Sequence, residues 1–169
     1  AQAVKAGADV TIVSSDKDLM QLVNDKVRLY DPMKNKPISF PEVAEKFGVT
    51  PDKVIDVQAL IGDSSDNVPG APGIGPKTAA ELIAMFGSLD AIIERAGEIK
   101  QPKRREAIQN NVEKIKMSRT LVTLRDDVPV TEPWRDFAVC DPEPATLLGF
   151  IDTMEFRTLG RRVREHFAK

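Results

Sequence analysis

The chain has 169 residues, of which 41% are hydrophobic and 30% are charged, a composition typical of a globular protein. Its 24 Lys and Arg against 26 Asp and Glu give a net charge of −2, which argues against a protein that is basic over its whole surface and binds nucleic acid everywhere. A single cysteine excludes an intramolecular disulfide. No apolar run approaches the roughly 20 residues needed to span a bilayer, so no membrane partner is expected.

The first elements along the chain predict a parallel α/β sheet. Residues 1–6 are expected to end a helix, and residues 8–13 are an apolar, β-branched run that is typical of a buried strand. A helix after residue 18 and a second strand at 27–30 complete a strand–helix–strand unit. Sites in such sheets lie at the carboxyl ends of the strands. Because the chain starts at Ala1, within a helical pattern, it is expected to be part of a longer protein.

The rest of the chain is expected to be mainly helical. A short edge strand is predicted at 38–40, and a basic tail that frays is predicted at 157–169. Phe47, Phe86 and Phe150 lie at helical spacing and are expected in the core. Helices are predicted at residues 41–47, 51–61, 76–86, 89–93, 103–123 and 145–156.

Residues 61–87 are the most informative stretch of the sequence. Their first part holds two carboxylates, Asp63 and Asp66, in a turn rich in Ser, Asn, Pro and Gly. Their second part is a Gly-Ile-Gly turn that leads into a helix, with Pro76 at the first helical position, where its missing N–H is not needed. Such a hairpin presents unpaired backbone N–H groups at the positive end of a helix, and these suit a phosphate.

Four aspartates are candidates for chemistry. Asp16 and Asp18 flank a lysine directly after the first strand, and Asp63 and Asp66 are three residues apart. Spacing alone favours helix capping or turn formation for each pair. Together, four carboxylates suit a hard divalent cation such as Mg²⁺ or Mn²⁺. The only histidine, His166, lies in the tail, which argues against a zinc site or a Ser-His-Asp triad.

Two segments resemble motifs of the 5′-nuclease (flap endonuclease) superfamily, in particular of the 5′→3′ exonuclease domains of bacterial DNA polymerases I. They are VTIVSSDKDLMQLV at residues 10–23 and LIGDSSDNVPGAPGIGPKTAAELIAMFGSLDAII at residues 60–93, in the order that the family uses. The likeness covers nearly the whole chain and corresponds to the C-terminal half of that domain. It implies an α/β fold: the remnant of a parallel, PIN-like sheet, followed by a mainly helical part with a helix–three-turn–helix (helix-hairpin-helix) motif.

The resemblance also implies a division into three regions. These are the C-terminal part of the nuclease core at 1–40, a helix–three-turn–helix DNA-binding region at 41–97, and the helical C-terminal part of the domain at 98–169. The implied partners are duplex or flap DNA, the N-terminal half of the nuclease domain and the downstream polymerase domains. The implied location is the bacterial cytoplasm, at the nucleoid.

The activity that the resemblance implies is that of a metal-dependent 5′→3′ exonuclease and flap endonuclease, which removes 5′ flaps or primers in replication and repair. Asp16, Asp18, Asp63 and Asp66 are then catalytic metal ligands, in a site that holds two Mg²⁺ or Mn²⁺ ions in the intact domain. Because the family has further ligands in its N-terminal half, the chain alone is expected to be inactive.

The resemblance further implies that the hairpin grips the backbone of DNA and can hold K⁺ through its carbonyl groups. The DNA-binding residues are then Gly73, Ile74, Gly75, Lys77 and Thr78. Two rival interpretations remain: a non-catalytic helix-hairpin-helix module in which the aspartates are caps, and an RNA-processing nuclease with a related sheet.

Overall fold

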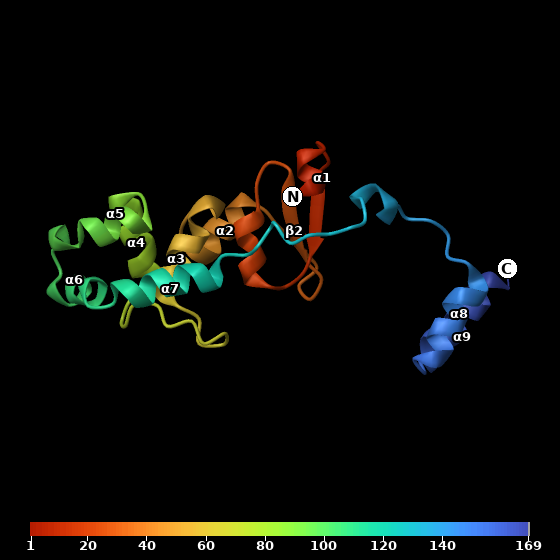
Figure 1. The fold of residues 1–169 in the computed structure, drawn as a ribbon. Helices are drawn as coiled ribbons and strands as arrows, with labels where there is room; N and C mark the ends of the chain where they lie inside the picture. Colours follow the sequence, from red (N-terminus) through yellow and green to blue (C-terminus); the bar gives the residue numbers. More distant parts are fainter. Residues whose placement is uncertain (169) are drawn as a thin grey trace. The chain divides into compact units, whose positions relative to one another are not determined.

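The computed structural model describes residues 1–168 (Figure 1). The chain forms two compact units, Ala1–Pro129 and a second one that begins at Val130. The boundaries at residues 40 and 97 between the three expected regions both fall inside the first unit. The division into these functional regions stays a prediction.

A three-stranded sheet begins the first unit. β1 (Val10–Val13) pairs in parallel with β2 (Val27–Asp31), which pairs in antiparallel with β3 (Lys36–Ile38). The parallel pair confirms the α/β prediction. β3 ends earlier than expected because Ser39 caps the next helix: its backbone N–H donates to the Glu42 carboxylate at 2.8 Å.

Helices make up most of the remainder of this unit. The α-helices are α1 (Gln2–Lys5), α2 (Phe40–Phe47), α3 (Val54–Ile61), α4 (Pro76–Phe86), α5 (Leu89–Glu94), α6 (Pro102–Gln109) and α7 (Val112–Val122). Three short 3₁₀ helices, η1 (Lys17–Leu22), η2 (Pro51–Lys53) and η3 (Ala96–Glu98), connect them. The backbone of Gly48 and of Gly87 has φ values of +72° and +86°, so these glycines end α2 and α4 as the sequence predicts.

The single helix expected at 103–123 is wrong, because the structure has two helices there. α6 ends at Gln109, and Asn111 is the N-cap of α7 with a non-helical φ of −128°. The Asn111 side chain donates a hydrogen bond to the backbone carbonyl of Ala107 at 2.9 Å. Such local bonds compete with the helical ladder and favour a break.

α3 lies at the centre of the core. It packs against α4 on one side and α7 on another, and its residues Val54, Val57 and Leu60 are fully buried. Phe47 and Phe86 are buried as predicted. The central position of α3 matters because the loop that follows it carries two of the candidate carboxylates.

The second unit contains η4 (Trp134–Phe137), α8 (Pro144–Thr153) and α9 (Arg157–Phe167). The expectation of a fraying tail is wrong, because α9 packs on α8 with Gly160 against Ile151, and Arg164 pairs with Asp152 at 2.6 Å. Phe150 is 57% exposed, so its expected place in the core is also wrong. None of the helices described in either unit is long and apolar enough to cross a membrane.

Candidate metal centre and hairpin

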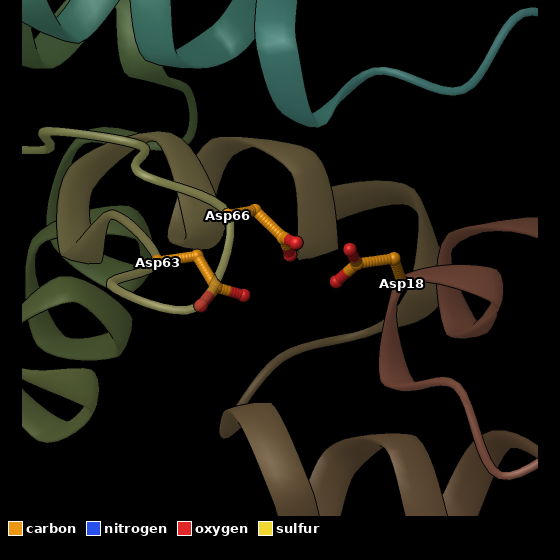
Figure 2. Close-up of side chains that lie close together, drawn as sticks. All are labelled: Asp18, Asp63 and Asp66. Carbon is orange, nitrogen blue, oxygen red and sulfur yellow. The ribbon is translucent and has the colours of Figure 1, made fainter.

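Three of the four predicted aspartates converge. Asp18, Asp63 and Asp66 each place a carboxylate oxygen within 4.8 Å of the others. Figure 2 shows the carboxyl groups of Asp18 and Asp66 pointing toward each other, with Asp63 beside them. Asp18 comes from η1, whereas Asp63 and Asp66 come from the loop after α3.

The loop after α3 is closed by backbone hydrogen bonds. Asp63 N–H donates to the Val68 carbonyl at 2.9 Å, and Val68 N–H donates back to the Asp63 carbonyl at 2.7 Å. Asp63 Oδ1 also accepts from the Ser65 N–H at 3.0 Å, and Asn67 takes the left-handed conformation with φ +56°. This small closed loop returns Asp66 to the side of Asp63.

Two glycines hold the base of the loop. A Cβ on Gly70 would lie 2.5 Å from the backbone nitrogen of Gly62, and one on Gly62 would lie 2.5 Å from the Val68 carbonyl oxygen. Both glycines also have positive φ, which strains any other residue. A side chain at either position would therefore cause both backbone strain and a steric clash. The chain therefore crosses itself here at a distance that only glycine permits.

Ser118 fixes the crossing from α7. Its hydroxyl is fully buried, accepts from the Gly70 N–H at 2.9 Å and donates to the Lys114 carbonyl at 2.8 Å. The sequence motifs do not point to this residue. A serine on the buried face of a helix could have indicated this contact, because a buried hydroxyl needs a hydrogen-bond partner.

Gln58 holds the carboxylate of Asp18 by a hydrogen bond. It lies in α3, is 4% exposed, and its amide nitrogen donates to Asp18 Oδ1. Its other amide atom, Oε1, is buried and has no hydrogen-bond partner among the described residues. Gln58 was also missed, although a glutamine on the buried stripe of a helix again pointed to a specific partner.

Lys17 forms an ion pair with Asp63 at the edge of the cluster. The side chain of Asp63 is only 9% exposed, and the hydrogen bond from Lys17 holds the pKa of this carboxyl below its usual value. The same bond raises the pKa of the Lys17 ammonium, and the charges of Asp18 and Asp66 raise it further. Three carboxylates and one ammonium leave this cluster with two negative charges in excess.

Asp16 does not join the three. It is exposed, and its Oδ1 accepts from the Asp18 N–H at 2.9 Å as the N-cap of η1. The structure thus gives Asp16 the capping role that spacing alone favoured. Its part in a metal site stays a prediction.

The glycine hairpin lies at the start of α4. Gly73 has φ +78° and requires glycine, whereas Gly75 is the N-cap with φ −92° and nothing within 4 Å of a Cβ built on it. Ile74 is buried, so only its backbone is available to a ligand. Lys77 is exposed on the first turn of α4, and Thr78 is half-buried beside it.

A cleft of ≈ 460 Å³ lies between Asp63 and the beginning of α4. Its lining includes Lys17, Lys46, Gln58, Asp63 and Pro76. Of the clustered carboxylates only Asp63 lines this cleft, together with Pro76, the first residue of α4.

Comparison with known proteins identifies the class. A model of the family described as 5'-3' exonuclease, C-terminal SAM fold, matches residues 49–145. The chain belongs to this family, as its two motifs predicted.

The relatives are much longer than this chain. The DNA polymerase I of Rhizobium leguminosarum is 59% identical over 165 residues, which cover 97% of this chain but only 16% of the relative. The chain thus spans about a sixth of that polymerase.

Two solved structures share the fold. A mutant of the T5 5'-exonuclease is 25% identical with a TM-score of 0.66, over 72% of this chain and 51% of that one. The T5 D15 protein co-crystallised with metal ions is 25% identical with a TM-score of 0.63, over 68% and 42% of the two chains.

Proposed function

We propose that this chain serves, within a DNA polymerase I, as part of a metal-dependent 5′→3′ exonuclease and flap endonuclease that removes 5′ flaps or primers in replication and repair. The observation that carries the proposal is the convergence of Asp18, Asp63 and Asp66 in a chain of the 5'-3' exonuclease family. The proposed setting is the DNA of a bacterial cytoplasm.

The proposed metal is Mg²⁺ or Mn²⁺, because the converging donors are all carboxylate oxygens. When bound, such an ion offsets charge on a phosphodiester and lowers the pKa of a bound water. Asp63 and Asp66 would hold it from one closed loop, and Gln58 would orient Asp18 toward it. Among the described contacts Asp16 uses only Oδ1 for capping, so its Oδ2 is proposed as a further ligand.

The proposed DNA contact is the hairpin of Gly73, Ile74 and Gly75, with Lys77 and Thr78. Support comes from Gly75. The fold does not require a glycine at this position, because its φ is ordinary and the space around it is open. A missing side chain at such a place leaves room for a phosphate to approach the first N–H groups of α4, which no side chain caps. A K⁺ ion bound by the hairpin carbonyls would make this binding stronger in K⁺ than in Li⁺ at equal ionic strength.

Titration with Mn²⁺ tests the metal site. A ligand that binds only the native state stabilises it, so the melting temperature of the protein should rise with Mn²⁺ concentration. Asp63→Asn with Asp66→Asn should abolish most of the rise. The matched control is Asp25→Asn with Asp126→Asn, which changes the net charge equally at two exposed positions. A rise that survives in the first double variant would place the metal elsewhere.

A further inference from the structure

Lys17 contacts a carboxylate that a metal ion would need. Asp63 Oδ1 accepts the Ser65 N–H, and Asp63 Oδ2 pairs with the Lys17 ammonium. The lysine comes from η1, next to Asp18, so one short element supplies both a candidate ligand and a cation.

The ammonium and a divalent ion cannot both lie against Asp63 without repulsion. A cation that bridges the three carboxylates would sit within the same 4.8 Å cluster that Lys17 borders. Like charges at such separations repel, and they do so more strongly where water is partly excluded, as around the 9% exposed Asp63 side chain. Departure of the ammonium from Asp63 Oδ2 would remove this repulsion and free the oxygen for the ion.

Lys17 is able to leave. Its side chain is 39% exposed, and it lines the ≈ 460 Å³ cleft beside Asp63. A lysine side chain has four rotatable bonds, so it can turn into this cleft without moving the backbone of η1.

We propose that Lys17 is an internal counter-ion of the acidic cluster, which neutralises Asp63 until a divalent cation displaces it. This inference rests on the proposed metal site. Lys17 then stabilises the metal-free protein and, by competition, raises the metal concentration at which the site fills.

The test compares two substitutions at one position. Lys17→Met keeps the aliphatic stem and removes the charge, whereas Lys17→Arg keeps the charge. Lys103→Met, at an exposed position in α6, controls for the change in net charge. The readouts are the melting temperature without metal and the Kd for Mn²⁺ by calorimetry, with circular dichroism to establish folding.

We expect Lys17→Met to melt at a lower temperature without metal and to bind Mn²⁺ at least about tenfold more tightly, since removing one close like charge changes binding by this order. Lys17→Arg should restore the wild-type melting temperature and the weaker Kd. Lys103→Met should match the wild type in both.

The outcomes separate this inference from the proposed function. A wild type that binds Mn²⁺ while Lys17→Met binds it no more tightly would overturn the role of Lys17 and leave the metal site intact. Binding by Lys17→Met alone would support the counter-ion. Binding by neither protein would overturn the metal site and, with it, the inference.

Discussion

Asp16 and Asp18 lie two residues apart but have different surroundings. The Asp16 carboxylate caps η1 at the surface, whereas Asp18 turns inward onto the amide of Gln58 and toward Asp66. Side chains two apart at the start of a helical turn point in different directions, so only one of the pair can follow the helix toward α3. The role of each carboxylate is thus set by the element that follows it.

The hydrogen-bond partners of polar side chains in the core could not be predicted from the sequence, because these partners are distant along the chain. Gln58 meets Asp18 across 40 residues of chain, and Ser118 meets Gly70 across 48. Helical periodicity predicts that such positions are buried, but it cannot say which distant group satisfies them. The grouping of Asp18, Asp63 and Asp66 could be predicted because their residue type and motif pointed to metal before any partner was known.

Glu42 should make the stability of the protein depend on pH. Its carboxylate accepts hydrogen bonds from the backbone and the hydroxyl of Ser39, both at 2.8 Å, and the backbone bond is the first cause of its lowered pKa. Because the folded-state pKa lies below that of the unfolded chain, about 4.3 for a glutamate, the carboxylate stabilises the fold above this pH. That stability is lost as the pH falls through the folded value.

We therefore expect Glu42→Ala to reduce the free energy of unfolding at pH 7 by about 1 kcal/mol, as for other capping residues. The difference from the wild type should shrink as the pH falls from 5 to 3. Urea unfolding at pH 7, 5 and 3 measures it, with Glu45→Ala, exposed in the same helix, as the control. A difference that stays constant with pH would contradict the assigned cause.

At the scale of elements, local signals set most helix bounds. Pro76, Gly87 and Ser88 act on the turn next to them, so the limits of α4 and α5 could be predicted from the sequence. The failures occur where distant contacts decide. α9 packs on α8, and the four arginines among its eleven residues do not indicate that partner.

The contact between α7 and the loop after α3 should be important for stability. Ser118→Ala removes the acceptor of the Gly70 N–H and leaves that buried donor without a partner, which costs about 1–3 kcal/mol. Thr120→Ala is the matched control, since its hydroxyl is on the same helix but bonds only the exposed Lys116 carbonyl. Chemical denaturation of both variants measures the difference; equal losses would show that the Ser118 bond contributes nothing.

The hairpin should bind duplex DNA without reading its sequence. Gly75→Val should leave the fold intact, because the added side chain meets open space, but should weaken DNA affinity by about tenfold or more, which is about 1.4 kcal/mol. Lys77→Ala should cost less and reduce the salt slope by about one ion. Fluorescence anisotropy across a salt series measures both effects.

The control for the hairpin is Gly97→Val, which also adds a side chain in open space, at η3. It should bind DNA like the wild type. Equal loss in both variants, or none in a folded Gly75→Val, would exclude Gly75 as the contact.

At the scale of the whole molecule, one connection carries both candidate sites. The segment between α3 and α4 contains Asp63, Asp66 and the glycine hairpin, and α3 itself anchors it in the core. The sheet contributes the other side through η1, which follows β1. Metal and DNA would therefore be aligned by a single rigid helix, and small shifts of α3 would affect both.

The 169-residue chain, by itself, should bind DNA weakly and should not cut it. Hydrolysis by two metals needs both ions held about 4 Å apart on either side of the scissile phosphate. The described residues bring together only three carboxylates, and Lys17 already pairs with one of them, so they provide for one ion. A substrate that is misplaced by about 1 Å reacts about 10²-fold more slowly, so a single ion would not position the phosphate well enough.

The measurement is cleavage of a labelled flap DNA in Mg²⁺ and in Mn²⁺, with the full-length polymerase of Rhizobium leguminosarum, 59% identical over the matched part, as the comparison. Strong metal-dependent cleavage by this chain that Asp63→Asn removes would contradict the prediction, because it would mean that the carboxylates present here suffice for the reaction.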